Sequence, residues 1–83
     1  MVIEKVIAFL QSDPEVKEKW DDKVTHDTHL IDAGVIDSFA IIKLIMFLEE
    51  EFNIKLESNE LVENNFSTLK NIEKLVIEKN NQK

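Results

Sequence analysis

The sequence contains no cysteine, and this absence removes several classes of small protein. Without thiols there is no disulfide framework, no thiolate zinc site and no cysteine nucleophile. Glycine and proline occur once each, which argues against a barrel or sandwich rich in turns. Leu, Ile, Glu, Lys and Asn are frequent instead, so we expect an all-α protein. At 83 residues, the chain should form a single domain.

Positive charge is also scarce, because ten basic residues stand against 17 acidic ones and give a net charge of -7. This is the wrong sign for holding the phosphates of nucleic acid or the surface of an anionic membrane. Residues 49–63 are the most acidic, with six glutamates and one lysine. We therefore expect a protein partner whose docking surface is basic.

Long apolar runs are absent as well. No uninterrupted stretch approaches the roughly 20 residues that a membrane-spanning helix needs, so we expect no membrane insertion. Glu4 and Lys5 interrupt the apolar start of the chain, which therefore does not resemble a signal peptide. The expected protein is a cytoplasmic monomer.

The spacing of apolar residues predicts four helices joined by one long loop. The first covers residues 2–11 and ends before Pro14, because a residue that precedes proline disfavours the α conformation. Residues 15–20 are long enough for one further turn. Residues 21–37 form the long loop, which Leu30 and Ile31 should anchor to the core.

The second helix should run from Ser38 to about Phe52, with Asn53 just past its end. Ser58 is positioned to cap a short third helix over residues 59–63, and Ser67 to cap the last helix. From about residue 79 we expect a disordered tail.

The second helix carries two apolar stripes where an amphipathic helix needs one. The first stripe is sufficient to bury the helix in a bundle and consists of Ile41, Leu44, Ile45, Leu48 and Phe52. The second lies more than about 100° away and consists of Phe39, Ile42 and Met46. Either the helix is buried on two sides, or the second stripe is an exposed contact patch rimmed by Lys43, Glu49 and Glu50. Phe47 faces away from both stripes, and the last helix or the loop should cover it.

Asp37 and Ser38 precede this helix, and both residue types are good helix caps. The simplest interpretation is that they only cap the helix. Two details weaken it: a capping box would need Glu or Gln where Ala40 and Ile41 stand, and one cap is sufficient. A helix N-terminus also favours an attached phosphate by about 0.3 to 1 kcal/mol. The hydroxyl of Ser38, on a loop edge beside Gly34, is therefore a candidate for modification by another enzyme.

Catalytic and metal sites find little support. The glycine pattern of the hydrolase elbow is missing, and His26 and His29 lie in the loop without a strand-turn-helix context. Asp27 and Asp32 lie near these histidines, but the spacing of a calcium loop is absent. We expect neither a hydrolase nor a metal site.

Taken together, the sequence GVIDSFAIIKLIMFLEEEFNIKL followed by NNFSTLKNIEKLV resembles the acyl, aminoacyl and peptidyl carrier proteins. The resemblance extends from about Leu30 to Ile77. Its strongest parts are Asp37-Ser38 with an apolar residue after them, the segment LIMFLEEEF, and the Ser67-Thr68 opening of the last helix. Each part is weak alone, but the ordered set is specific.

The resemblance implies a four-helix carrier whose Ser38 receives the 4'-phosphopantetheine arm of coenzyme A from a phosphopantetheinyl transferase. The terminal thiol of the arm would hold an acyl or aminoacyl group as a thioester. Asp37 and Gly34 would belong to the attachment motif, and the partner-binding positions would be Phe39, Ile42, Met46, Glu49 and Glu50. The implied partners also include an adenylating or acylating loading enzyme and a downstream acyl transferase or synthase. The carrier would catalyse no reaction itself.

Departures from the fatty-acid carriers indicate the branch. Val35 and Ile36 both stand between Gly34 and Asp37, Phe39 replaces the usual leucine, and Ala40 and Lys43 occupy positions that are often acidic. This pattern resembles the stand-alone D-alanyl carriers of teichoic acid modification and some carriers of peptide or secondary metabolism. The alternative is a small acidic helical adaptor in which Ser38 only caps the helix and the second stripe grips a partner helix.

Overall fold

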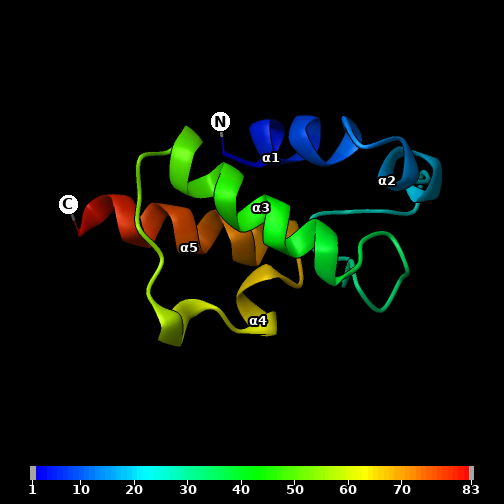
Figure 1. Ribbon diagram of the computed structural model, residues 1–83. Helices are drawn as coiled ribbons and strands as arrows, with labels where there is room; N and C mark the ends of the chain where they lie inside the picture. Colours follow the sequence, from blue (N-terminus) through cyan, green and yellow to red (C-terminus); the bar gives the residue numbers. More distant parts are fainter. Residues whose placement is uncertain (1, 83) are drawn as a thin grey trace.

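The computed structural model describes residues 2–82, and all of the regular secondary structure in that range is helical (Figure 1). The helices are α1 (Val2–Gln11), α2 (Pro14–Lys19), α3 (Ser38–Glu51), the 3-10 helix η1 (Ser58–Glu60), α4 (Glu63–Phe66) and α5 (Leu69–Asn81). The all-α prediction is confirmed, as is the long loop between the first helical region and the helix that starts at Ser38.

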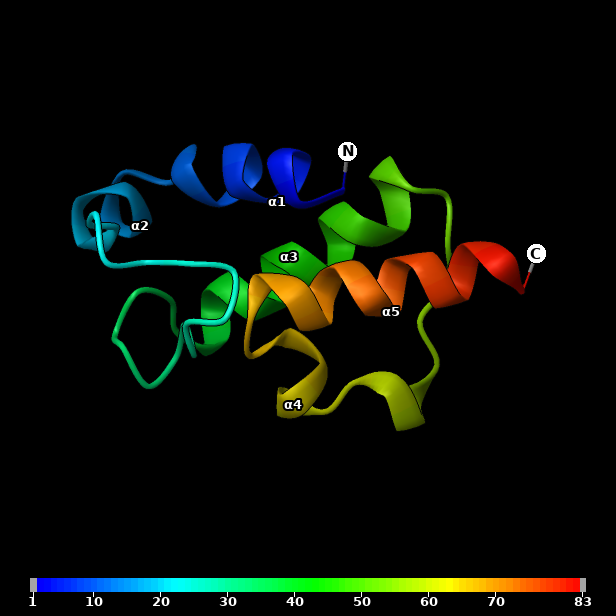
Figure 2. The same cartoon turned by 180° about the vertical axis from the view of Figure 1, so that it is seen from behind.

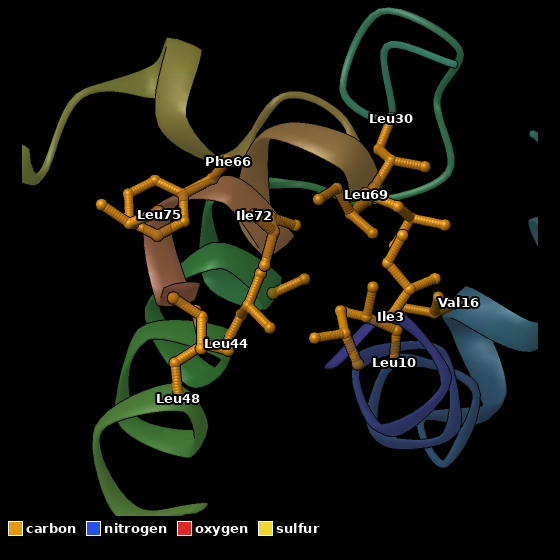
Figure 3. Packing of buried hydrophobic residues seen from close by; sticks show 14 of the residues in the cluster. Ile3, Leu10, Val16, Leu30, Leu44, Leu48, Phe66, Leu69, Ile72 and Leu75 are labelled. Carbon is orange, nitrogen blue, oxygen red and sulfur yellow. The ribbon is translucent and has the colours of Figure 1, made fainter. Parts of the chain in front are cut away.

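The core lies where α1, α3 and α5 meet. Figure 1 shows α5 alongside α1 and behind α3, and Figure 2, from the opposite side, shows α5 in front of α3. In both views α4 lies below the bundle. Leu44 and Leu48 of α3 are fully buried and point into the same core as Ile72 of α5 (Figure 3). The first apolar stripe thus faces the core as its spacing predicts: Leu44 and Leu48 are buried, and its other members, Ile41, Ile45 and Phe52, are partly buried.

The turn expected after the first helix is α2. Pro14 is its first residue, where a missing N–H costs nothing. The carboxylate of Asp13 caps it by accepting the N–H of Glu15 at 2.9 Å. Val16 is buried in the core, at 5% exposure. This short helix is therefore held in place by both a cap and a buried side chain.

The long loop is fixed to the core at Leu30, which is fully buried. Its N–H donates to the carbonyl oxygen of Ser67 at 2.8 Å, and its own carbonyl oxygen accepts from Val35 and Ile36. The N–H of Lys70 also donates to the carbonyl oxygen of His26 at 3.0 Å. The predicted anchoring of the loop through Leu30 is confirmed, and Ile31 is partly buried against the core.

The segment after α3 differs from the prediction. Residues 59–63 do not form one helix: η1 ends at Glu60, Val62 is extended, and α4 starts at Glu63. The carboxylate of Glu60 accepts the N–H of Glu57 at 2.8 Å, which closes η1 as a short turn. The helical turn that follows is placed by Phe66, whose side chain is 1% exposed. Because this aromatic ring is buried, the third helix lies closer to the C-terminus than the predicted range of residues 59–63.

The last helix is capped by Thr68 and not by Ser67. The hydroxyl of Thr68 accepts the N–H of Asn71 at 3.0 Å. Ser67 is buried, and its hydroxyl donates to the carbonyl oxygen of Asn64 at 3.0 Å, inside the junction between α4 and α5. The last helix also extends to Asn81, so residues 79–81 are helical where the sequence predicted a disordered tail.

An ion pair joins η1 to the end of α5. Nζ of Lys79 lies 2.9 Å from Oε1 of Glu60, and both side chains are largely shielded from solvent. The hydrogen bond from the backbone of Glu57, together with Lys79, holds the pKa of the Glu60 carboxyl below its ordinary value of 4.5. This contact explains why the helix continues through Lys79.

Among the described residues, no helix has the length and apolar character needed to cross a membrane.

We predict that Glu60→Ala lowers the free energy of unfolding by about 1 to 2 kcal/mol at neutral pH, because it removes a cap and an ion pair. Glu60→Gln keeps an acceptor for the Glu57 N–H and should lose less. Because the folded-state pKa of Glu60 is depressed, its ionised form stabilises the fold above pH 4.5 and this contribution disappears as the pH falls below that value.

Urea unfolding of the wild type and both variants, at neutral pH and well below pH 4.5, measures this contribution. The difference between wild type and Glu60→Gln should shrink at the lower pH. An equal difference at both pH values would show that the charge of Glu60 is not responsible.

Candidate functional site

The N-terminus of α3 separates the two residues that sequence analysis treated as alternative caps. Asp37 is the N-cap, and its Oδ1 accepts the N–H of Ala40 at 2.9 Å. Ser38 is the first helical residue and is exposed. Within residues 2–82, its hydroxyl has no hydrogen-bond partner. The capping role therefore belongs to Asp37, and the hydroxyl of Ser38 is available to solvent.

A tight turn positions these two residues. Gly34 has φ +77°, a left-handed conformation that favours glycine, and its N–H donates to the carbonyl oxygen of Ile31 at 2.9 Å. Val35 and Ile36 follow and are buried, at 3% and 5% exposure. The two residues between Gly34 and Asp37 are thus hydrophobic anchors that fix the start of α3 to the core.

Beside Ser38 lies an open groove of about 570 Å³. Its walls come from three segments: the loop before α3, the first turns of α3, and the chain that enters α4. Apolar side chains dominate the lining and include Ile31, Ile36, Ile41, Ile45, Val62 and Phe66. Glu63 lines the groove as well and supplies a carboxylate. A flexible group attached to Ser38 would have an apolar surface to lie against.

The second apolar stripe of α3 is exposed. Phe39 is 74%, Ile42 56% and Met46 65% accessible to solvent, so the second stripe is not buried in the bundle. Exposed apolar side chains that adjoin one another on one helix face are typical of a binding surface. We refer to Phe39, Ile42 and Met46 as the α3 patch.

The charged residues around the α3 patch differ in their engagement. Glu50 is exposed. Glu49 is half-buried, and its Oε2 accepts the N–H of Leu56 at 2.9 Å, which holds the chain that leaves α3. Lys43 lies 3.8 Å from a carboxylate oxygen of Asp13. Glu49 therefore has a structural role that its sequence position did not reveal, whereas Glu50 forms no such hydrogen bond with the residues that the structure describes.

Phe47 is covered by α1, where the sequence predicted the last helix or the loop. Its ring stacks on Phe9 with 4.3 Å between centroids and an interplanar angle of 12°. The edge of Phe52 also meets it, at 6.3 Å between centroids. This aromatic cluster fixes α3 against the N-terminal helix and so contributes to the placement of Ser38.

The histidines are not arranged as metal ligands. Among residues 2–82, no three His, Cys, Asp or Glu side chains are grouped so that they could bind a metal ion. His29 instead lies between Asp32 and Glu63, at 3.6 and 3.7 Å from their carboxylate oxygens.

Sequence analysis also missed Leu61 and Val62, which are 46% and 47% exposed beside the groove. Their adjacency within an acidic segment was the available signal.

Comparison with known families agrees with this geometry. A family model described as "Phosphopantetheine attachment site" matches residues 16–76, which include the loop, α3 and most of α5. The chain belongs to this family. Membership implies a covalently attached 4'-phosphopantetheine and a carrier on which other enzymes act, rather than an enzyme.

Curated relatives give a similar result over a shorter stretch. The D-alanyl carrier protein of Streptococcus pyogenes serotype M5 (strain Manfredo) is 41% identical over 46 residues, which are 55% of this chain and 58% of the relative. The D-alanyl carrier protein of serotype M1 of the same species matches with the same identity and coverage. The chain thus aligns with little more than half the length of these relatives. No solved structure matches significantly.

We predict opposite outcomes for two phenylalanines of α3. Phe47→Ala should lower the free energy of unfolding by about 2 kcal/mol, because it removes the stacked pair with Phe9 and leaves a gap between helices. Phe39→Ala, in the exposed patch, should change it by less than about 0.5 kcal/mol. Thermal and urea unfolding of both variants measures the contrast. A large loss in Phe39→Ala would mean that the α3 patch is part of the core.

Proposed function

We propose that Ser38 is the attachment site of the phosphopantetheine arm, and that the holo protein carries an acyl or aminoacyl group to partner enzymes. The observation that carries this proposal is that Ser38 is exposed and that its hydroxyl forms no hydrogen bond with residues 2–82, because Asp37 is the cap. Family membership requires an attachment residue, and the serine at the start of α3 has the chemistry for a phosphodiester.

The other serines of the chain are less suited to this role. The hydroxyl of Ser12 donates to the carbonyl oxygen of Phe9, and that of Ser67 is buried in the α4–α5 junction. Ser58 is exposed but starts a 3-10 turn of three residues. Ser38 starts a helix of 14 residues, whose N-terminal N–H groups and dipole favour a phosphate by about 0.3 to 1 kcal/mol.

The groove beside Ser38 supports the role of a carrier. When attached, the arm supplies a terminal thiol that holds the cargo as a thioester. The apolar walls formed by Ile41, Ile45 and Val62 give the chain of the arm a surface to contact near its point of attachment. The role of the protein is to tether the cargo, because a flexible arm raises the effective concentration of that cargo at a docked enzyme.

The α3 patch is the proposed docking surface for those enzymes. It lies on the helix that starts at Ser38, so an enzyme that contacts Phe39 and Met46 has the attachment point at its edge. Glu50 and the overall charge of -7 favour partners with basic residues around an apolar contact. The partners proposed are a phosphopantetheinyl transferase, an adenylating or acylating loading enzyme, and an acyl transferase or synthase that receives the cargo.

For the cargo, we propose an aminoacyl group, with D-alanine as the first candidate. The support is the similarity to relatives named D-alanyl carrier proteins, over 46 residues. The Gly-x-x-Asp-Ser-Phe pattern at residues 34–39 adds to it, because this spacing resembles that of the D-alanyl carriers.

We predict that the wild type gains the mass of one phosphopantetheine group when incubated with coenzyme A and a broad-specificity phosphopantetheinyl transferase. Ser38→Ala should gain none, because the alanine side chain offers no oxygen for the phosphodiester. Ser58→Ala, which removes another exposed serine, should gain the group as the wild type does. Intact-mass spectrometry reads all three. Equal modification of Ser38→Ala would place the attachment elsewhere.

A second prediction concerns the α3 patch. Met46→Glu on the holo protein should reduce the rate of loading by an adenylating or acylating enzyme at least about tenfold, since about 1.4 kcal/mol of lost apolar contact has that effect. Ile77→Glu is the matched control, because Ile77 is 48% exposed on α5 and away from the patch. Circular dichroism and thermal unfolding should show both variants folded. Equal loading of the two variants would contradict the proposed docking surface.

A further inference from the structure

His29 lies between two carboxylates that belong to different parts of the fold. Nδ1 of its ring is 3.6 Å from Oδ2 of Asp32 in the same loop. Nε2, on the other side of the ring, is 3.7 Å from Oε2 of Glu63, the first residue of α4. Among residues 2–82, no other carboxylate oxygen lies within 4.0 Å of the ring nitrogens. The ring therefore bridges the loop and α4.

One ring nitrogen also organises the loop. The N–H of Asp32 donates to Nδ1 of His29 at 3.1 Å, which requires that Nδ1 carry no proton. The N–H of Ala33 donates to the carbonyl oxygen of His29 at 2.9 Å and continues the same turn. In this arrangement Nδ1 is the acceptor for the loop backbone, and Nε2 faces the carboxylate of Glu63.

Protonation changes each of these contacts. With a proton on Nδ1, the ring cannot accept the N–H of Asp32, so the turn loses one hydrogen bond. The imidazolium then has an N–H on each side, one near the carboxylate of Asp32 and one near that of Glu63, and both attractions strengthen. Histidine is the side chain that ordinarily changes charge between about pH 5 and pH 8.

Both contacts of the His29 ring involve segments that line the groove beside Ser38. Ile31 belongs to the turn that His29 closes, Glu63 belongs to the chain entering α4, and both line the groove. We propose that His29 is a pH-sensitive positioning residue whose protonation draws the start of α4 toward the loop and reshapes this groove. Its functional meaning rests on the proposed role of Ser38, because the groove matters there as the surface along which the arm lies.

The same loop supplies a matched control. His26 is exposed, and only its backbone carbonyl oxygen is engaged, by the N–H of Lys70. Within residues 2–82, its ring forms no hydrogen bond or ion pair. Among the described residues, a proton on His26 would thus meet no carboxylate oxygen within 4.0 Å and would break no backbone hydrogen bond.

The test follows the unmodified protein by NMR between about pH 5 and pH 8, in wild type, His29→Asn and His26→Asn. In His29→Asn, the new amide side chain offers an Oδ1 that can accept the N–H of Asp32 but takes up no proton, so the fold should persist. In the wild type, the Asp32 N–H and the methyl groups of Ile31 and Val62 should shift together with the His29 ring. These shifts should disappear in His29→Asn and remain in His26→Asn.

Methyl shifts that persist in His29→Asn, or that are absent from the wild type while its ring titrates, would overturn the proposal. If His29→Asn fails to fold, Glu63→Gln serves instead. It removes the charge on α4 alone, so the Asp32 N–H should still respond to pH while the Val62 response is lost. An unchanged Val62 response would equally overturn the proposal. All of these measurements use protein without the arm, so their failure is separate from a failure of Ser38 to accept it.

Discussion

The backbone hydrogen bond from the N–H of Leu30 to the carbonyl oxygen of Ser67, at 2.8 Å, holds the long loop against the junction of α4 and α5, beside the bond from the N–H of Lys70 to the carbonyl oxygen of His26. Leu30 is fully buried, so water does not compete for this bond and its loss would leave two buried polar groups unpaired. The carbonyl oxygen of the same residue accepts the N–H groups of Val35 and Ile36. Leu30 therefore fixes both the path of the loop and the point from which Asp37 starts α3.

From that point, α3 divides its surface between folding and binding. Leu44 and Leu48 are fully buried, whereas Phe39 and Met46 are mostly exposed on the same helix. Because the two sets do not overlap, residues of the exposed face can change with little effect on the core. The aromatic contact between Phe47 and Phe9 fixes a third side of the helix. A helix held on two sides and free on one presents a rigid surface, which limits the entropy lost when a partner docks.

The sequence was sufficient to predict the parts of the fold that depend on local periodicity. The start of α3 and its two stripes follow from a repeat of about 3.6 residues, and Leu30 and Ile31 are recognisable as an apolar anchor in a polar loop. The errors occur where tertiary contacts decide between local options. Ser67 and Thr68 are both caps by residue type, and only the burial of Ser67 against α4 selects Thr68. The engagement of Glu49 with Leu56, seven residues later, has no local signal.

Two residues of capping type, Asp37 and Ser38, stand at the start of α3, and the structure gives a physical reason for having both. A single Ser at the N-cap would accept a backbone N–H with its hydroxyl oxygen, and an attached group would then compete with a bond worth about 1 kcal/mol. Here the carboxylate of Asp37 accepts the N–H of Ala40, and across the described part of the chain the hydroxyl of Ser38 takes part in no hydrogen bond. Attachment at Ser38, as proposed, would remove no contact that holds α3. The apo and holo forms should then share one helix start, and a partner enzyme would meet the same α3 patch before and after the arm is attached.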